Sequence, residues 1–445
     1  MRPLRVMAVT LALVVAACAG ESGGETTSIP DPAATTEPGA PSTTEADETT
    51  STTGESAVES LTFWHYWDGL NGEVITELAD RYSTETGVAV EPAFFGYGDL
   101  LTKLQTSAGG GEKPDLAVAD LVWMPALARS GTVVALDDFI AASDVDADDF
   151  YPELLDINRY DGGLYGLPVS TNNLELFYNK ELFEAAGLDP EAPPTNWDEL
   201  SEAAGACADP SAGRTGMELF TEPGEGLTWQ FQVYLWQAGG EFLNEDLTAA
   251  AFNSPEGEAA LQYWIDLIDS GGSGVAPWGQ FGQGAACMVM DGSWMVGIWS
   301  AEPPFEFGTA SMPYPADGTM ATNMGGEQGF VMAEDPAAQQ AAFDFLAWLT
   351  SPEIQVEWDQ RTGFMPVRAS VAEDPAYLEH IETTEPRYLP FVENQQFARS
   401  RPAVPEYSEL SDVFSRELEA ALLGEATAAE ALAAAETAVN SILGG

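Results

Sequence analysis

The alternation of strand-like and helix-like segments after residue 60 constrains the fold of this chain more than any other feature. The segment 114–120 is an apolar run that ends in a carboxylate, which is typical of a parallel strand buried on both faces. The order βαβαβ predicts an α/β fold with a doubly wound sheet, whose ligand site lies beyond the carboxyl ends of the strands. The segments are, in order, a strand at 61–64, a helix carrying Val74, Leu78 and Tyr82 that ends at Gly87, a strand at 88–95, a helix at 98–107 and the strand at 114–120.

The pattern starts again near Ser170 and continues to the end of the chain. About 385 residues follow the first 58, which is more than one hydrophobic core usually supports, so we expect two lobes. The later elements are a strand at 174–178, a helix at 179–186 that ends at Gly187, a helix opened by a capping box at Thr195–Asp198, helices that start at Ser254-Pro255 and Ser351-Pro352, a helix at 337–349, and two helices at 409–423 and 426–443 separated by Gly424.

The first residues have the features of an export signal. Two arginines precede an apolar run at 6–15 that is too short to span a bilayer, and small residues then lead to Cys18. We predict a signal peptide at 1–17 and a lipidated Cys18, as in bacterial lipoproteins; a plain secretory signal with an incidental cysteine is the alternative. Residues 18–59 are rich in Ser, Thr, Pro and acids, which predicts a disordered linker that extends from the anchor.

Charge and cysteine content narrow the possible partners. A formal net charge of −57 argues strongly against nucleic acid or an anionic membrane surface as a partner, because the chain would be repelled by both. With Cys18 assigned to the lipid, Cys207 and Cys287 remain as an even pair in an exported chain, and we predict that they form a disulfide. Two buried free thiols are the alternative.

An ordered set of motifs covers nearly the whole chain after the linker. Together they resemble the extracellular solute-binding proteins of ABC importers, in the branch that carries sugars, maltodextrins and glycerol 3-phosphate. No single motif is decisive, but their order is specific. The motifs are Leu164–Pro168, Leu176–Phe183, Ala186–Pro190, Pro194–Leu200, Phe281–Met288, Asp291–Trp294, Gly325–Gly326 and Thr362–Val367.

This resemblance implies a two-lobe fold of the periplasmic-binding-protein type, in which a hinge joins the lobes and the ligand cleft lies between them. By analogy, residues 60–168 and 323–364 form the first lobe, and residues 170–310 and 366–445 form the second. The protein is expected to be a monomer that captures a carbohydrate outside the membrane and delivers it to the transmembrane permease subunits of an ABC importer. It needs no cofactor or metal for this role, and the lipid anchor holds it at the outer face of the cell membrane.

Several candidate ligand-binding residues follow strand ends. Trp67 and Asp68 come directly after the first strand, whereas Trp64 lies inside it and is expected in the core. Tyr97 lies in the next loop, although Gly98 beside it also fits a purely structural turn. Asp120 ends the third strand, where it can cap the following helix, contact the ligand, or do both.

The resemblance and the residue chemistry add further candidates, because sugars are bound by flat aromatic faces and by groups that hydrogen-bond hydroxyls. Trp229 is favoured over Trp236, which shares its helix face and is expected in the core. A carboxylate at Glu327 suits a neutral polyol and repels phosphate. Arg401 either bonds ligand oxygens or forms a surface ion pair. The remaining candidates are Thr171 and Asn172 at the first lobe crossing, Ser293 and Trp294 in a Gly-flanked loop, and Gly325 and Gly326 at a later crossing, where bare backbone can approach ligand.

Motifs of enzymes are missing from the sequence. After residue 59 it contains no nucleophile-elbow motif, phosphate-binding loop or zinc-protease helix, and its histidines are His65 and His380. Asp144–Leu155 starts like a calcium loop but lacks its glycine and final glutamate, so we interpret it as an acidic helix start. We expect a binding protein for a sugar or oligosaccharide. Glycerol 3-phosphate or a glycerophosphodiester is the alternative ligand, and a secreted carbohydrate-active hydrolase is the alternative class.

Overall fold

The computed structural model describes residues 58–301 and 305–444. The predicted signal peptide at 1–17, Cys18 and nearly all of the predicted linker at 18–59 therefore lie outside the described residues. Within the described ranges, no helix combines the length and the apolar character needed to cross a membrane.

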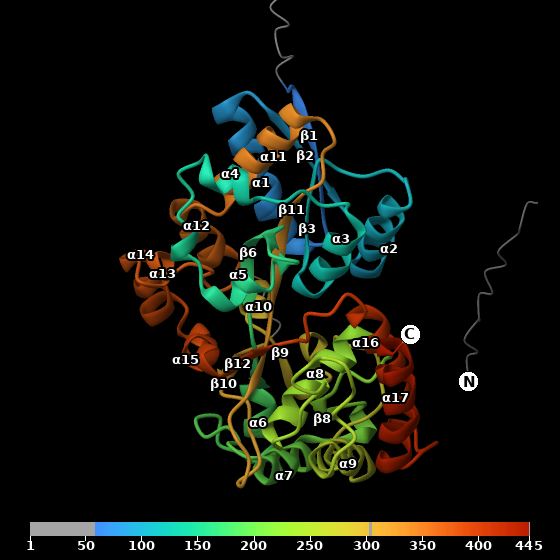
Figure 1. Cartoon of the computed structure of the whole chain (residues 1–445). Helices are drawn as coiled ribbons and strands as arrows, with labels where there is room; N and C mark the ends of the chain where they lie inside the picture. Colours follow the sequence, from blue (N-terminus) through green and yellow to red (C-terminus); the bar gives the residue numbers. More distant parts are fainter. Residues whose placement is uncertain (1–57, 302–304, 445) are drawn as a thin grey trace, which may run out of the picture. The chain divides into compact units, whose positions relative to one another are not determined.

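The largest of the three β-sheets in the described residues has six strands. Its strands β1, β2 and β3 lie in the upper part of Figure 1. Its order is β12-β11-β3-β1-β2, and β6 also pairs with β11. β1 runs parallel to both β2 and β3, so the predicted βαβαβ unit is confirmed, whereas β11 returns antiparallel along β3. The strands are β1 (Ser60–His65), β2 (Ala89–Phe94), β3 (Leu116–Asp120), β6 (Leu167–Asn172), β11 (Thr322–Val331) and β12 (Ala398–Ser400).

The second sheet has four strands in the order β10-β7-β9-β8. β7 and β9 are antiparallel, and β8 is parallel to β9. The strands are β7 (Leu174–Asn179), β8 (Thr215–Glu218), β9 (Ala286–Gly292) and β10 (Phe307–Ala310), and a separate hairpin is formed by β4 (Arg159–Tyr160) and β5 (Gly163–Leu164). Two sheets with their own helices confirm the predicted two-lobe α/β fold.

The chain passes between the two sheets at segments that are bonded to each other. Only Asn173 separates β6 of the first sheet from β7 of the second. At this crossing the Leu174 amide donates to the Thr322 hydroxyl over 3.0 Å, and the Met365 amide donates to the Thr171 carbonyl over 2.8 Å. β12 belongs to the C-terminal segment predicted for the second lobe, yet it pairs with β11. The exact lobe boundaries stay a prediction.

Helices cover both sheets. α1 and α11 pack on the strands of the first sheet, α6 and α7 pack on the second, and α16 and α17 pack on α8 and α9. The helices are α1 (Gly69–Thr86), α2 (Tyr97–Ala108), α3 (Met124–Ser130), α4 (Asp137–Ala141), α5 (Pro152–Asp156), α6 (Lys180–Ala186), α7 (Trp197–Cys207), α8 (Glu225–Gln237), α9 (Pro255–Asp269), α10 (Trp294–Ala301), α11 (Pro336–Leu349), α12 (Pro352–Thr362), α13 (Ala369–Ala372), α14 (Pro375–Glu379), α15 (Leu389–Asn394), α16 (Tyr407–Leu422) and α17 (Ala428–Leu443).

The predicted helix starts are confirmed, with one shift of register. Ser254 caps α9 by accepting the Gly257 amide over 3.2 Å, with Pro255 in the first helical position. The cap of α7 lies one residue later than predicted, because Asn196 accepts the Glu199 amide over 3.0 Å. The predicted capping box at Thr195–Asp198 does not form, since the Glu199 carboxylate accepts the amide of Thr195 over 2.8 Å rather than that of the cap residue. The helix predicted at 98–107 is confirmed as α2, which begins one residue earlier, so that Tyr97 opens the helix instead of lying in a loop and Gly98 is not part of a tight turn.

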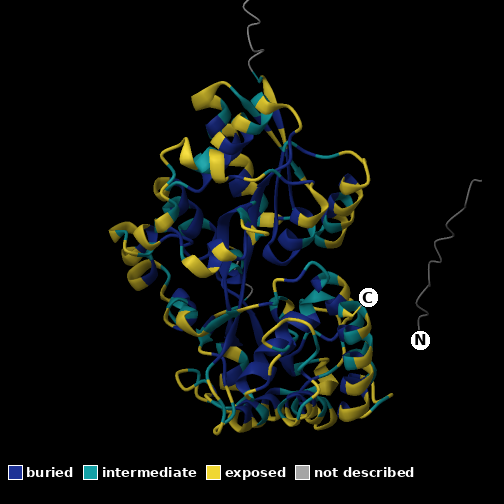
Figure 2. Cartoon of the chain, in the orientation of Figure 1, coloured by how far each residue is buried: buried dark blue, intermediate teal, exposed yellow. Residues whose placement is uncertain are grey.

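Burial follows the strands of both sheets, and the outer helix faces are exposed (Figure 2). Trp64 and Trp236 are buried, as predicted for core residues. The predicted disulfide between Cys207 and Cys287 is confirmed and joins α7 to β9. Both cysteines are fully buried. The cross-link therefore ties a helix of the second lobe to the strand that ends just before Ser293 and Trp294.

Candidate functional site

A cavity of about 680 Å³ lies beyond the carboxyl ends of β1 and β3, where the two lobes meet. Eleven of the thirteen predicted ligand-binding residues line it, and their contact with a ligand stays a prediction. These eleven are Trp67, Asp68, Tyr97, Asp120, Asn172, Trp229, Trp294, Gly325, Gly326, Glu327 and Arg401.

Thr171 and Ser293 lie outside this lining. Thr171 is fully buried in β6, and its hydroxyl donates to the Gly325 carbonyl over 3.0 Å. Ser293 is also fully buried, and within the described part of the chain its hydroxyl has no hydrogen-bond partner. Thr171 thus supports the strand that carries Gly325 and Gly326 rather than facing the cavity.

The cavity has two walls of different chemistry. What we call the carboxylate wall comes from the first lobe and from β11; the aromatic wall comes from the second lobe. The carboxylate wall consists of Tyr66, Trp67, Asp68, Asn71, Tyr97, Asp120 and Glu327, and the aromatic wall consists of Phe220, Leu227, Trp229, Trp278, Trp294, Met295 and Ile298.

Hydrogen bonds fix the carboxylate wall. The Tyr66 hydroxyl donates to Glu327 over 2.8 Å, and the Tyr97 hydroxyl donates to Asp120 over 2.8 Å. The two tyrosine rings meet edge to face with centroids 5.2 Å apart. Asp68 precedes α1 but makes no capping bond with its side chain, and it is exposed. Its carboxylate is therefore available to a ligand.

Glu327 is a buried carboxyl at the centre of this wall. Besides Tyr66, the Ser170 hydroxyl donates to it. Burial raises the pKa of Glu327 to about 7, although these two hydrogen bonds favour the charged form. The side chain therefore carries a proton in a large fraction of molecules at neutral pH, and it can donate to a ligand oxygen as well as accept from a hydroxyl.

Gly325 and Gly326 serve the packing of β11 against β6. A Cβ atom at Gly325 would lie 2.3 Å from the Asn172 side-chain oxygen, and one at Gly326 would lie 2.3 Å from the Ser170 carbonyl oxygen. Gly326 also has a φ of 142°, which side chains rarely adopt. The close approach of β6 therefore requires glycine here, whether or not a ligand also approaches the backbone.

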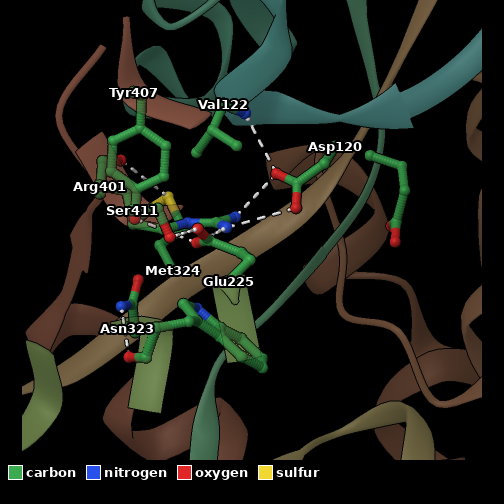
Figure 3. A network of polar contacts seen from close by, with 12 residues as sticks. Asp120, Val122, Glu225, Asn323, Met324, Arg401, Tyr407 and Ser411 are labelled. Atoms are coloured by element: carbon green, nitrogen blue, oxygen red, sulfur yellow. Dashed lines mark hydrogen bonds and ion pairs between the residues drawn. The ribbon is translucent and has the colours of Figure 1, made fainter. Parts of the chain in front are cut away.

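Arg401 is bound between two carboxylates (Figure 3). Its Nη2 donates to Asp120 over 2.8 Å, and its Nη1 donates to Glu225 over 2.7 Å and to Asp120 over 3.3 Å. Only 3% of the Arg401 side chain is exposed, so the ion pair is buried. The surface ion pair that was the alternative role for Arg401 is therefore wrong in its location. Asp120 also accepts the Val122 amide over 3.1 Å and so caps the following turn, as one predicted role required.

The rest of this network comes from the second lobe. Glu225 accepts the Tyr407 hydroxyl over 3.0 Å and the Ser411 hydroxyl over 2.6 Å. Burial raises the pKa of Glu225, with the Arg401 charge opposing the shift. Burial would lower the pKa of Arg401, but the charges of Asp120 and Glu225 hold it well above the usual value. The guanidinium is fully charged and already matched by two acids.

Stacked rings form the aromatic wall. The Trp294 ring lies nearly parallel to Trp229, with centroids 5.7 Å apart, and to Phe364, with centroids 6.1 Å apart. Trp278 is 48% exposed at the rim, and its indole N–H donates to Asp291 over 3.0 Å. Burial raises the pKa of Asp291 to about 7. Flat ring faces of this kind suit the apolar faces of a bound molecule.

The loop that carries Trp278 is anchored by a buried carboxylate. Glu218 accepts the backbone amides of Gly279, Gln280 and Phe281 over 2.5, 3.0 and 2.6 Å. Burial still raises the pKa of Glu218, because its desolvation outweighs these three bonds. The three hydrogen bonds of Glu218 therefore hold the loop, and with it Trp278, in position at the rim of the cavity.

Sequence reasoning missed much of the lining. The largest missed part is the segment 220–227, which runs from the loop after β8 into the first turn of α8 and includes Glu225. Its Gly/Pro-containing run Thr221–Gly226 before a helix was the available signal, because such runs mark loops. The other missed lining residues are Tyr66, Asn71, Trp278, Met295, Ile298 and Phe364.

The lining offers polar atoms but little free positive charge. Buried oxygens of Asn71 and Asn172 and the Trp229 indole nitrogen have no hydrogen-bond partner among residues 58–301 and 305–444. Arg401 is the one basic residue of the lining in these same ranges. The described residues also contain no group of three or more His, Cys, Asp or Glu that could hold a metal ion, and in the calcium-like segment Asp146 accepts the Asp148 amide over 3.1 Å. The arrangement fits a neutral ligand with many hydroxyls.

Comparisons with known proteins agree in family and fold. The family profile described as bacterial extracellular solute-binding protein matches residues 77–384. A crystal structure of the cyclic alpha-maltosyl-1,6-maltose binding protein from Arthrobacter globiformis is 48% identical and covers 87% of this chain and 99% of its own, with a TM-score of 0.75.

Two further relatives differ in the ligands they bind. An ABC transporter solute-binding protein from Thermotoga lettingae bound with alpha-D-tagatose is 29% identical, covers 86% of this chain and 100% of its own, and has a TM-score of 0.79. The sn-glycerol-3-phosphate-binding periplasmic protein UgpB from Yersinia pestis is 27% identical over 341 residues, which are 71% of this chain and 76% of that protein.

Proposed function

The chain belongs to the bacterial extracellular solute-binding protein family, and from this membership we propose that it captures a neutral oligosaccharide in the cavity between its lobes. It then delivers the sugar unaltered to the permease subunits of an ABC importer. The observation that carries the proposal is the pairing of the aromatic wall with the carboxylate wall across one cavity. Stacked rings cover the apolar faces of sugar rings, and carboxylates and amides bond their hydroxyls.

The size of the cavity supports an oligosaccharide. The cavity volume of about 680 Å³ falls within the roughly 300–1,000 Å³ of pockets that enclose drug-sized ligands, which is the size class of a disaccharide rather than of glycerol 3-phosphate. The protein with 48% identity is named for binding a cyclic maltosyl-maltose. We therefore propose an α-linked glucose oligosaccharide as the ligand.

Glycerol 3-phosphate is the second candidate, favoured by the UgpB relatives. A phosphate site needs free donors of positive charge, typically arginine forks or lysines. Arg401 is the one cation of the described lining, and two carboxylates already bind it. An anionic ligand would have to approach the exposed carboxylates of Asp68 and Glu222 without a free counter-charge, so the geometry favours the neutral sugar.

The position of the protein in the cell is also proposed. Export by the signal peptide at 1–17 and lipidation of Cys18 would hold a monomer at the outer face of the membrane, with the linker at 18–59 letting it reach the permease. Mass spectrometry of the mature N-terminus tests this: we expect a diacylglycerol-modified cysteine. Replacement of Cys18 by alanine should release the protein into the medium, and membrane retention of that variant would contradict the anchor.

A binding screen tests the ligand. Isothermal titration should detect maltotriose and cyclic maltosyl-maltose, and thermal shifts should rise with their concentration because a ligand that binds only the folded state stabilises it. Tagatose, ribitol and glycerol 3-phosphate serve as the comparison set. Binding of glycerol 3-phosphate alone would overturn the sugar, and chromatographic detection of shortened glycans after incubation would overturn delivery without catalysis.

A further inference from the structure

Arg401 connects residues from both lobes, and its two partners are far apart in the sequence. Asp120 ends β3 in the first sheet and lies 281 residues from Arg401. Glu225 begins α8, whose Gln230 side chain donates to the Met290 carbonyl of β9 in the second sheet over 3.1 Å. Arg401 itself directly follows β12, near the crossing between the lobes. One guanidinium therefore bridges the first lobe, the second lobe and a segment beside the hinge.

The bonds around Arg401 divide into a holding set and a bridging set. Glu225, Tyr407 and Ser411 are bonded to one another through Glu225, and all three belong to α8 or α16, which pack together. On the other side, Asp120 is fixed within the first lobe by Tyr97 and by the Val122 amide. Each lobe thus keeps its own carboxylate in place without Arg401. The two hydrogen bonds from Arg401 to Asp120 are the ones that cross between these sets.

We propose that Arg401 is a closure residue: Glu225 holds its guanidinium on the second lobe, and the forked bond to Asp120 fastens the first lobe over the cavity. Arg401 is then a positioning residue for ligand retention, not the ligand-binding arginine that sequence reasoning suggested. The proposal concerns the same cavity and rests on the proposed function only where it speaks of sugar release.

The burial of the contact explains why it can act as a fastening. Forked arginine–carboxylate bonds are strong and directional, and removing one partner of a buried pair leaves an uncompensated charge. The side chains of Arg401 and Asp120 are 3% and 9% exposed. A second contact between the lobes, Arg129 of α3 with Glu406 just before α16, is 49% and 28% exposed. Exposed pairs contribute little, so this pair is a matched control within the same molecule.

Ligand-free protein provides the first test, which does not depend on the identity of the sugar. Small-angle X-ray scattering of the full chain should give a larger radius of gyration for Asp120→Asn than for the wild type, because the first lobe is no longer fastened. Arg129→Ala should leave the radius unchanged. An unchanged radius in Asp120→Asn, or an equal increase in Arg129→Ala, would overturn the proposal. Circular dichroism checks that each variant is folded. Arg401→Lys is a second variant, which keeps the positive charge but loses the forked pair of hydrogen bonds, and its radius of gyration should increase less than that of Arg401→Gln.

Ligand kinetics provide the second test. With a sugar that binds the wild type, stopped-flow tryptophan fluorescence should show that Asp120→Asn raises the dissociation rate tenfold or more while the association rate changes little. A double-mutant cycle with Arg401→Gln should then show strong coupling between the two positions. Equal dissociation rates would overturn the closure role. If the dissociation rate rises but the radius of gyration of the ligand-free variant equals that of the wild type, Asp120 contacts the sugar directly and the proposal fails. If no sugar binds the wild type, the proposed ligand is wrong, and the scattering experiment alone decides whether Arg401 acts in closure.

Discussion

The two walls of the cavity are built in different ways. The carboxylate wall presents side chains from strand ends and from β11, and hydrogen bonds between its own members, such as Tyr66 to Glu327 and Tyr97 to Asp120, fix their positions. The aromatic wall presents rings from helices and from a loop, and stacking rather than polar bonds holds Trp229 and Trp294. The carboxylate wall therefore supplies hydrogen-bonding groups that orient the hydroxyls of a ligand. The aromatic wall supplies apolar surface that covers the faces of its sugar rings.

This division of roles predicts that damage to one wall changes binding differently from damage to the other. Loss of a ring removes buried apolar area from the complex, which costs affinity for every sugar. Loss of a carboxylate changes which hydroxyls are bonded, which costs selectivity between sugars. Four experiments, taken from the largest expected effect to the smallest, test or refine this contrast.

Removing the disulfide should have the largest effect and should act on one lobe. Replacing Cys207 and Cys287 by alanine opens a loop of sequence separation 80, and the expected loss in unfolding free energy is about 2–5 kcal/mol. Because β9 leads directly to Trp294, the aromatic wall should loosen. Hydrogen exchange read by mass spectrometry should show faster exchange in α7 and β9 and unchanged exchange in β1 and β3.

The control for this experiment is the wild type with and without reductant. Reduction of the wild type should reproduce the stability of the double alanine variant. Equal acceleration of exchange in both sheets would show that the lobes unfold as one unit, and would remove the contrast between the walls at the level of stability.

Trp294→Ala should cause the largest loss of affinity. Trp294 stacks on Trp229 of the aromatic wall and on Phe364 of the cavity lining, so its removal breaks both stacking contacts. We expect binding of the best sugar to weaken about 30-fold, or ~2 kcal/mol, measured by titration calorimetry. The loss should be similar for different sugars, because stacking does not distinguish hydroxyl patterns.

Trp348→Ala is the matched control, because Trp348 is also a half-buried tryptophan but lies on α11, away from the cavity. It should leave the affinity unchanged. A loss in Trp294→Ala that is confined to one sugar would give the aromatic wall a role in selectivity and so contradict the division.

The same two walls differ in how far the sequence predicts them. Trp67, Asp68 and Asp120 were found because the carboxyl ends of neighbouring parallel strands meet at one edge, so position along the chain implies position in space. Phe220 and Trp278 come from connecting segments without strand or helix periodicity, and their placement depends on contacts such as that of Glu218 with the 279–281 backbone.

The fold itself was predictable further than the site. The strands β1 to β3 and the helix α9 were predicted from local signals, namely hydrophobic periodicity and cap residues. The disulfide was predicted from the number of cysteines in the chain. The partners of Arg401 were not predictable in the same way, because Asp120 and Glu225 are 281 and 176 residues away and meet it only after both lobes have formed.

The pH dependence of stability should reveal the buried acid of the carboxylate wall. Burial raises the pKa of Glu327 from an ordinary value near 4.5 to about 7, so between these values the folded state holds a proton that the unfolded chain has released. Lower pH therefore favours folding in this window, and this contribution to the free energy of unfolding is lost as pH rises to 7 and above. Urea denaturation from pH 5 to pH 8 should show the decline.

Glu327→Gln removes this titratable carboxyl group, so the free energy of unfolding should fall less steeply between pH 5 and pH 8. Asp291→Asn is the parallel variant, because burial raises the pKa of Asp291 to about 7 as well, beside Trp278 rather than on the carboxylate wall. Sugar selectivity should change in Glu327→Gln and not in Asp291→Asn. Identical pH profiles for the wild type and both variants would show that neither acid titrates in this window.

Trp278→Phe should have the smallest effect and tests the edge of the aromatic wall. The change keeps an aromatic ring but removes the indole N–H that donates to Asp291 over 3.0 Å, so the half-exposed ring loses its fixed orientation. We expect sugar affinity to fall only about threefold, or ~0.7 kcal/mol, in titration calorimetry. Trp348→Phe is the control and should bind as the wild type does. A loss as large as that of Trp294→Ala would mean that the rim ring, rather than the Trp229–Trp294 stack, supplies most of the apolar contact, and the aromatic wall would then depend on a loop instead of on two helices.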